Sequence, residues 1–231
     1  MLVGRWREAR QELEEALRIK LDFCASWRNR VQLALFEKDY DDADAVLARA
    51  EDAKGCPPEA ISNLRCRVRA WRAFDAGDWE ATWEAAQGTD CGSDLGDLSV
   101  ISSYYAALRA GQPDEARAIE QKLAEHRAKY SSEKAAVSPL ELHLEGIRLR
   151  LAGHPAEAVA KLRAADEALS FWPEEAYLKL ATRLELSQAL VEAGNGAEAA
   201  KVLAEVESVN ALLAERWRPC LAEARACAGA G

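Results

Sequence analysis

The stretch Pro139–Leu169, PLELHLEGIRLRLAGHPAEAVAKLRAADEAL, contains the pattern that decides the fold. Leu142, Gly146 and Leu149 follow one another at steps of four and three residues, which places them on one face of a helix. A second helix carries small and apolar residues at steps of four, three and four, namely Ala158, Leu162, Ala165 and Leu169. Neither helix can bury its face alone, so the stretch predicts a helical hairpin that packs against neighbouring copies.

The residues Ala-Gly-His-Pro separate the two helices. Gly153 can adopt the left-handed conformation that ends a helix. Pro155 suits the first turn of the next helix, because its missing N–H would have no intrahelical acceptor there. Ser138, Pro139 and Glu141 supply an N-cap, a first-turn proline and a first-turn acid for the helix before the bend. The sequence therefore predicts where the first helix begins, where it ends and where the second helix begins.

The same bend recurs along the whole chain. Its anchor residues are Gly4, Lys38, Gly77, Gly111, Gly153 and Gly194, separated by 34, 39, 34, 42 and 41 residues. The anchors predict one stack over residues 1–231, with repeats at 23–52, 60–87, 98–130, 139–170 and 174–209, a truncated first repeat at 1–21 and a capping helix at about 219–228.

Apolar and small residues keep a regular register around these anchors. They are Trp6, Ala9, Leu13 and Ala16 after Gly4; Trp27, Val31 and Ala34 before Lys38; Tyr40, Ala43, Leu47 and Ala50 after it; and Gly146, Ala158 and Ala165. Trp79 follows Gly77 in the same way, with Thr82 in place of an alanine. The arrangement resembles the tetratricopeptide (TPR) family. This resemblance implies an all-α protein, an α-α superhelix of stacked antiparallel hairpins that forms a solenoid.

Composition agrees with an all-α class and excludes several functions. No window alternates apolar and polar residues over the length of a strand. The net charge of −9, from 30 basic and 39 acidic residues, argues against a protein that grips nucleic acid. No apolar run approaches the roughly 18 residues of a membrane span, and no signal-peptide core follows Met1. We therefore expect a cytoplasmic protein that binds neither nucleic acid nor membrane.

The cysteines and histidines show no arrangement typical of a metal-binding or catalytic site. The six cysteines form no CxxC pair and share no spacing with the three histidines, so we expect reduced packing residues and no metal site. Adjacent carboxylates such as Glu14 and Glu15 point about 100° apart on a helix and cannot share a substrate. Only His143 falls on a helix face of interest, and it lacks a partner. We expect no catalytic residues, no cofactor and no enzymatic activity.

The resemblance to TPR repeats implies a binding face. In that family the first helices of the repeats line the concave surface, and the matching positions here are Arg28, Gln32, Arg67, Trp71, Tyr105, His143 and Gln188. Arg28 and Arg67 would hold a carboxylate while the rings of Trp71 and Tyr105 take an apolar side chain. In the alternative, the arginines are ordinary surface residues and the two rings pack between repeats.

Two functions are compatible with this pattern. The first is a non-enzymatic scaffold for protein–protein interaction, binding an acidic or carboxylate-bearing protein or peptide. The second is the sensory or regulatory C-terminal arm of a larger bacterial signalling protein, such as an NTPase, a protease or a transcription regulator. The truncated first repeat favours the second function, or else pairing of the exposed N-terminal flank with another chain or a second copy.

Overall fold

The computed structural model describes residues 5–87, 97–130, 137–170 and 176–216. These residues form helices only, without a strand, and successive helices pack against each other. The helices are α1 (Trp6–Ile19), α2 (Cys24–Phe36), α3 (Tyr40–Asp52), α4 (Pro58–Ala76), α5 (Trp79–Gln87), α6 (Asp97–Arg109), α7 (Pro113–Tyr130), α8 (Pro139–Leu151), α9 (Pro155–Ala168), α10 (Ala176–Glu192) and α11 (Gly196–Arg216). Gly4 and the predicted capping helix at about 219–228 lie outside the described residues.

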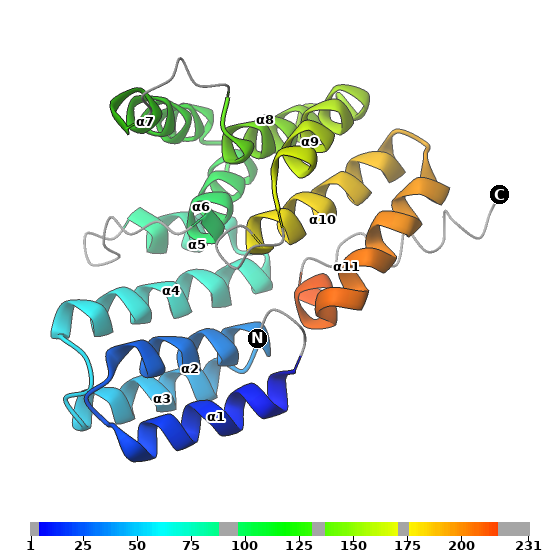
Figure 1. Ribbon diagram of the computed structural model, residues 1–231. Helices are drawn as coiled ribbons and strands as arrows, with labels where there is room; N and C mark the ends of the chain where they lie inside the picture. The colour runs from blue at the N-terminus through cyan, green and yellow to red at the C-terminus, as the bar shows by residue number, and fades with distance from the viewer. Residues whose placement is uncertain (1–4, 88–96, 131–136, 171–175, 217–231) are drawn as a thin grey trace. The chain divides into compact units, whose positions relative to one another are not determined.

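The chain divides into two compact units, and the boundary falls within α6. The N-terminal unit extends to Ala106, and the C-terminal unit begins at Ala107. In the N-terminal unit α1, α2, α3, α4 and α5 pack in order, and α2 also contacts α4. In the C-terminal unit α8 packs on α9, and α10 packs on both α9 and α11, as Figure 1 shows.

Five predicted bends lie between successive helices and share a left-handed backbone residue. These residues are Lys38 (φ 57°), Gly77 (72°), Gly111 (71°), Gly153 (82°) and Gly194 (81°). At the second bend the amide of Gly77 donates to Phe74 O, and the amide of Asp78 donates to Ala73 O, both at 3.0 Å. Equivalent pairs close the other four bends. This double hydrogen bond is the Schellman motif, which satisfies the last carbonyls of a helix.

The residue after the bend starts the next helix. The Asp39 side chain accepts a hydrogen bond from the amide of Asp42, and the Asp78 side chain accepts one from the amide of Ala81, each at 3.0 Å. Thr82 is fully buried, and its hydroxyl donates to Asp78 O at 2.6 Å. One helix therefore ends and the next begins within two or three residues, a connection typical of helical hairpins.

A further left-handed bend ends α3, between the predicted repeats at 23–52 and 60–87. Lys54 has a φ of 51°, and the amide of Gly55 donates to Ala50 O at 2.8 Å. A Cβ on Gly55 would lie 2.6 Å from Leu21 O, so only glycine fits against the α1–α2 connection. Trp27, a predicted core residue that is 1% exposed, donates its indole N–H to the same Leu21 O at 2.7 Å.

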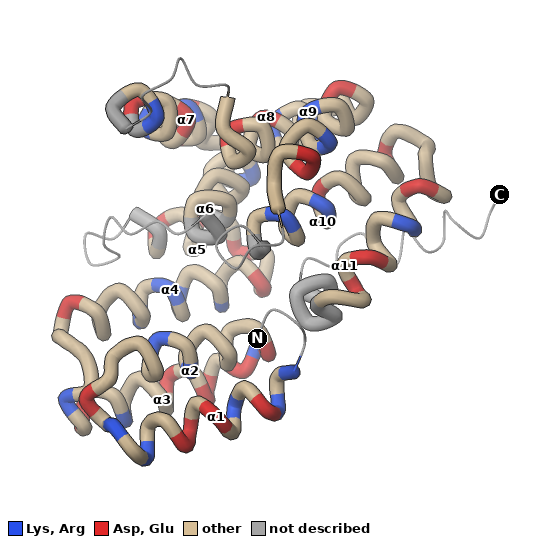
Figure 2. Tube along the Cα trace, in the orientation of Figure 1, with Lys and Arg blue, Asp and Glu red and all other residues tan. Residues whose placement is uncertain are grey.

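Ion pairs join the first three helices around a buried arginine. Arg30 on α2 is 3% exposed and contacts Glu14 on α1 at 2.8 Å and Asp42 on α3 at 2.7 Å. Arg10 on α1 also reaches Asp42, at 3.2 Å. Both signs of charge alternate along α1 in Figure 2. The charged face of α1 is therefore part of the packing of this unit.

The prediction for the two faces of the α8–α9 hairpin is right for α9 and only partly right for α8. All four predicted residues of the second helix are buried, namely Ala158, Leu162, Ala165 and Leu169. On α8, Leu142 and Leu149 are only half-buried, while the buried residues are His143, Leu144, Gly146, Ile147 and Arg150. Since α8 packs against α9 and α10, its buried face is wider than one stripe and includes polar residues.

Gly146 allows the close approach of α8 to α9. A Cβ at this position would lie 2.5 Å from Leu162 Cγ and 2.7 Å from its Cδ2. Contacts under 3 Å require displacement of a buried side chain that has little room to move.

We expect Gly146→Ala to lower the free energy of unfolding by about 1–3 kcal/mol through overpacking. Urea denaturation followed by circular dichroism measures the change. The second substitution Leu162→Ala should offset part of the effect, so the double variant is more stable than the two single effects predict when added. Additive effects would show that Leu162 does not limit the space at Gly146.

The expectation of reduced cysteines is wrong for the N-terminal unit. Cys24 and Cys56 form a disulfide across 32 residues of sequence, and Cys66 is also disulfide-bonded. Sequence spacing gave no sign of this, because only the fold brings the start of α2 beside the residues before α4. Disulfides persist in oxidising compartments and are rare in the cytosol, so this pair argues against the cytoplasmic location predicted from composition.

Removing the Cys24–Cys56 disulfide with Cys24→Ala/Cys56→Ala should lower the free energy of unfolding by about 3–4 kcal/mol. That value follows from the entropy of closing a loop of this length. Guanidinium denaturation tests it, and the single variant Cys24→Ala, which loses the same bond, should match the double variant. Peptide mapping without reductant should recover the two cysteines linked. Free thiols at both positions would contradict the disulfide.

Candidate functional site

The seven predicted site residues occupy very different environments. Arg28 is exposed, and Gln32, Arg67 and Gln188 are half-buried. Trp71, Tyr105 and His143 are buried, with exposed fractions of 4%, 7% and 0%. Four of the seven residues therefore remain accessible to a partner, and all four carry an amide or a guanidinium group.

Three of the accessible residues form one polar surface on α2 and α4. Arg28 and Gln32 are four residues apart on α2, which places them one turn apart on the same helix face. Arg67 of α4 donates from Nη1 to Gln32 Oε1 at 3.4 Å. We call these three residues the α2–α4 polar surface. It presents two guanidinium groups and an amide, groups suited to bind a carboxylate.

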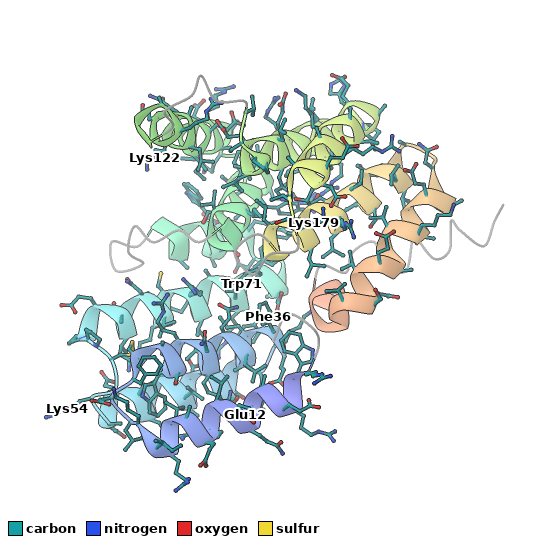
Figure 3. All side chains as sticks on the ribbon, viewed as in Figure 1. Glu12, Phe36, Lys54, Trp71, Lys122 and Lys179 are labelled. Atoms are coloured by element: carbon teal, nitrogen blue, oxygen red, sulfur yellow. A yellow bond between two sulfur atoms is a disulfide. The ribbon has the colours of Figure 1, made fainter. Side chains whose placement is uncertain are left out.

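Trp71 and Tyr105 belong to an aromatic cluster inside the N-terminal unit. The ring of Phe74 lies 5.4 Å from Trp71, 5.5 Å from Trp79 and 6.0 Å from Tyr105, measured between centroids. Trp79 and Tyr105 are 5.4 Å apart. These distances are typical of favourable aromatic pairs. Trp71, labelled in Figure 3, therefore packs α4 against its neighbours, as the alternative from the sequence proposes.

His143 faces the interior of the C-terminal unit. Its Nδ1 lies 2.9 Å from Thr182 Oγ1 on α10, within hydrogen-bonding distance. Its Nε2 is buried and has no hydrogen-bond partner among the described residues. Burial lowers the pKa of His143 from 6.5 to about 3, because the charged form would lose its hydration. The ring is therefore neutral near pH 7 and cannot reach a partner on the surface.

A buried ion pair lies on the same two helices. Arg150, seven residues after His143, donates from Nε to Glu185 Oε2 at 3.0 Å, and both side chains are at most 5% exposed. Arg150 also contacts Glu192 at 2.9 Å. Burial raises the pKa of Glu185 above its ordinary value, although the charge of Arg150 opposes that shift. The sequence does not indicate this pair, because charged residues on a helix are usually solvated.

A pocket of about 240 Å³ lies between α7 and α8. Its apolar lining comes from Leu123, Ala124, Val137 and Leu144, and its polar lining from Glu120, Glu141, Glu145 and Arg148. The acidic side chains are paired within the unit: Glu120 with Arg148 at 3.6 Å, Glu141 with Arg127 at 3.3 Å, and Glu145 with Lys161 at 3.0 Å. The pocket therefore has space for an apolar side chain. Its acidic residues are already paired with basic ones, so the lining does not favour a ligand of either charge.

Among the residues with described coordinates, no group of three or more His, Cys, Asp and Glu side chains converges to hold a metal ion. No helix in this part of the chain combines the length and apolarity that crossing a bilayer requires.

No protein-family model, curated protein or solved structure matches the chain. The resemblance to TPR repeats therefore remains an interpretation of the sequence pattern.

We expect His143 to make the protein less stable as the pH falls. Below pH 6.5 the unfolded chain binds a proton at this residue, whereas the native protein does so only near pH 3, so stability is lost between these values. From pH 7 to pH 5 the wild type should lose about 2 kcal/mol more than His143→Gln does. Urea denaturation of both proteins at each pH measures the difference. Equal losses would place His143 in contact with solvent.

Proposed function

We propose that the chain is a non-enzymatic, TPR-like solenoid that binds a protein or peptide through a carboxylate. The α2–α4 polar surface supports this proposal most directly. The recurring left-handed bends and the packing of successive helices agree with the stacked hairpins of that family. On this proposal α2 and α4 are neighbouring first helices, and their shared surface lies on the concave side.

The composition of this surface determines which partner fits. Arg28 and Arg67 supply planar groups with several N–H donors, which match the two oxygens of a carboxylate. Gln32 holds Arg67 through its Oε1 and keeps its amide N–H₂ as an additional donor. The rings of Trp71 and Tyr105 are not part of the proposed contact, because both pack inside the unit. A C-terminal carboxylate or an acidic side chain is therefore the expected ligand group.

An array of peptides that end in a free carboxylate or in a carboxamide tests the proposal. We expect the protein to retain the carboxylate series and to bind the amide series at least about tenfold more weakly, since hydrogen bonds to a charged group contribute about 1.5–3 kcal/mol. Arg28→Ala and Arg67→Ala should each weaken the carboxylate series by a similar factor, because each removes a donor group.

Arg69→Ala is the matched control. Arg69 is an exposed arginine on α4 two residues from Arg67, hence about 200° around the helix from it. This variant changes the net charge equally and should leave peptide binding unchanged. If it weakens binding as much as Arg67→Ala, the effect comes from overall charge, and the α2–α4 polar surface is not the site.

A further inference from the structure

The connection between α1 and α2 exposes three large apolar residues next to one another. Ile19, Leu21 and Phe23 are 73%, 52% and 50% exposed. Two exposed charged residues of opposite sign, Lys20 and Asp22, alternate with them. Neither charge is in an ion pair within the part of the chain that the structure describes, although Lys20 lies 5.7 Å from the Phe23 ring centroid. We call residues 19–23 the IKLDF segment.

The N-terminal unit holds this segment in one conformation. Leu21 O accepts the indole N–H of Trp27 at 2.7 Å, and Gly55 packs against that carbonyl. The Cys24–Cys56 disulfide joins the next residue of the chain to the α3–α4 connection. In Figure 1 the α1–α2 and α3–α4 connections lie at the same end of the unit, and Lys54 is labelled there in Figure 3. The apolar side chains are therefore exposed from a fixed backbone.

The order of residues in the IKLDF segment is self-complementary. On each side of Leu21 a charged residue is followed by an apolar one: Lys20 and Ile19 on one side, Asp22 and Phe23 on the other. The two charged residues have opposite signs. A two-fold axis beside Leu21 would bring Lys20 of one copy towards Asp22 of the other, twice. It would also gather the exposed apolar residues of both copies around the axis. A patch that contacts its own copy in this way forms a closed isologous interface.

We propose that the IKLDF segment is a homodimer contact, with a second copy of this chain as its partner. The segment covers less than the roughly 800 Å² per partner of a standard interface, so the dimer is weak and depends on concentration. This contact differs from the pairing of the N-terminal flank that the sequence predicts, and it does not involve the α2–α4 polar surface. It therefore stands independently of the proposed function.

Charge reversal provides a direct test by analytical ultracentrifugation up to about 1 mM protein. The wild type should dimerise with increasing concentration. Asp22→Lys and Lys20→Asp should each weaken the homodimer at least about tenfold, since both cross-pairs become repulsive. The double variant Lys20→Asp/Asp22→Lys restores both pairs and should recover dimerisation to within about threefold of the wild type.

The decisive measurement is analytical ultracentrifugation of a mixture of the two single variants. The chain with two lysines meets the chain with two aspartates, so both cross-pairs are attractive and a heterodimer should form where neither variant dimerises alone. All substituted positions are exposed, and unchanged thermal unfolding by circular dichroism checks the fold. A monomeric wild type, or a mixture no more dimeric than its components, would overturn the proposal. So would flotation of monomeric protein with anionic phospholipid vesicles, which would assign the segment to a lipid surface.

Discussion

The left-handed bend that joins two helices within two or three residues is the constraint on which the rest of this fold depends. At Gly77 the Schellman hydrogen bonds end α4, and the next residue, Asp78, caps α5, so few backbone groups at the junction lack a partner. Such a short connection allows the second helix to turn back along the first. Successive helices then pack against each other from α2 to α5 and from α8 to α11.

This packing places polar side chains inside the units and thereby fixes which helices can be neighbours. A helix that packs against more than one neighbour buries more than one apolar stripe, and Arg30, His143 and Arg150 lie on helices of this kind. Each meets a complementary group on a specific neighbouring helix: Glu14 and Asp42, Thr182, and Glu185 respectively. A buried charge without its partner is strongly destabilising. A different pairing of hairpins would separate these groups, so the polar contacts select one order of stacking.

The sequence predicts the bends well because their physical requirement is local. A left-handed residue favours glycine, and regular spacing identified even Lys38, where the anchor is not glycine. Lys54 was missed because a lysine in that conformation has no signature and no regular spacing announces it. Features that depend on neighbours were predicted less well. The resemblance to TPR repeats placed Trp71 and Tyr105 on a binding face, but it could not show that α4, α5 and α6 enclose both rings. The Cys24–Cys56 pair also depends on packing, which brings together residues 32 apart.

Enclosure of the aromatic rings changes the kind of recognition that the proposed binding surface can provide. With Trp71 and Tyr105 in the core, Arg28, Gln32 and Arg67 offer donors and charge but little apolar area. Exposed charged contacts contribute more to orientation and rate of association than to affinity, so a partner held there needs a second contact to stay bound. The IKLDF segment lies at the start of the same helix, because Phe23 is the N-cap of α2. Two copies joined through this segment would present two α2–α4 polar surfaces, and a partner with two carboxylates could then bind both with an affinity that neither surface provides alone.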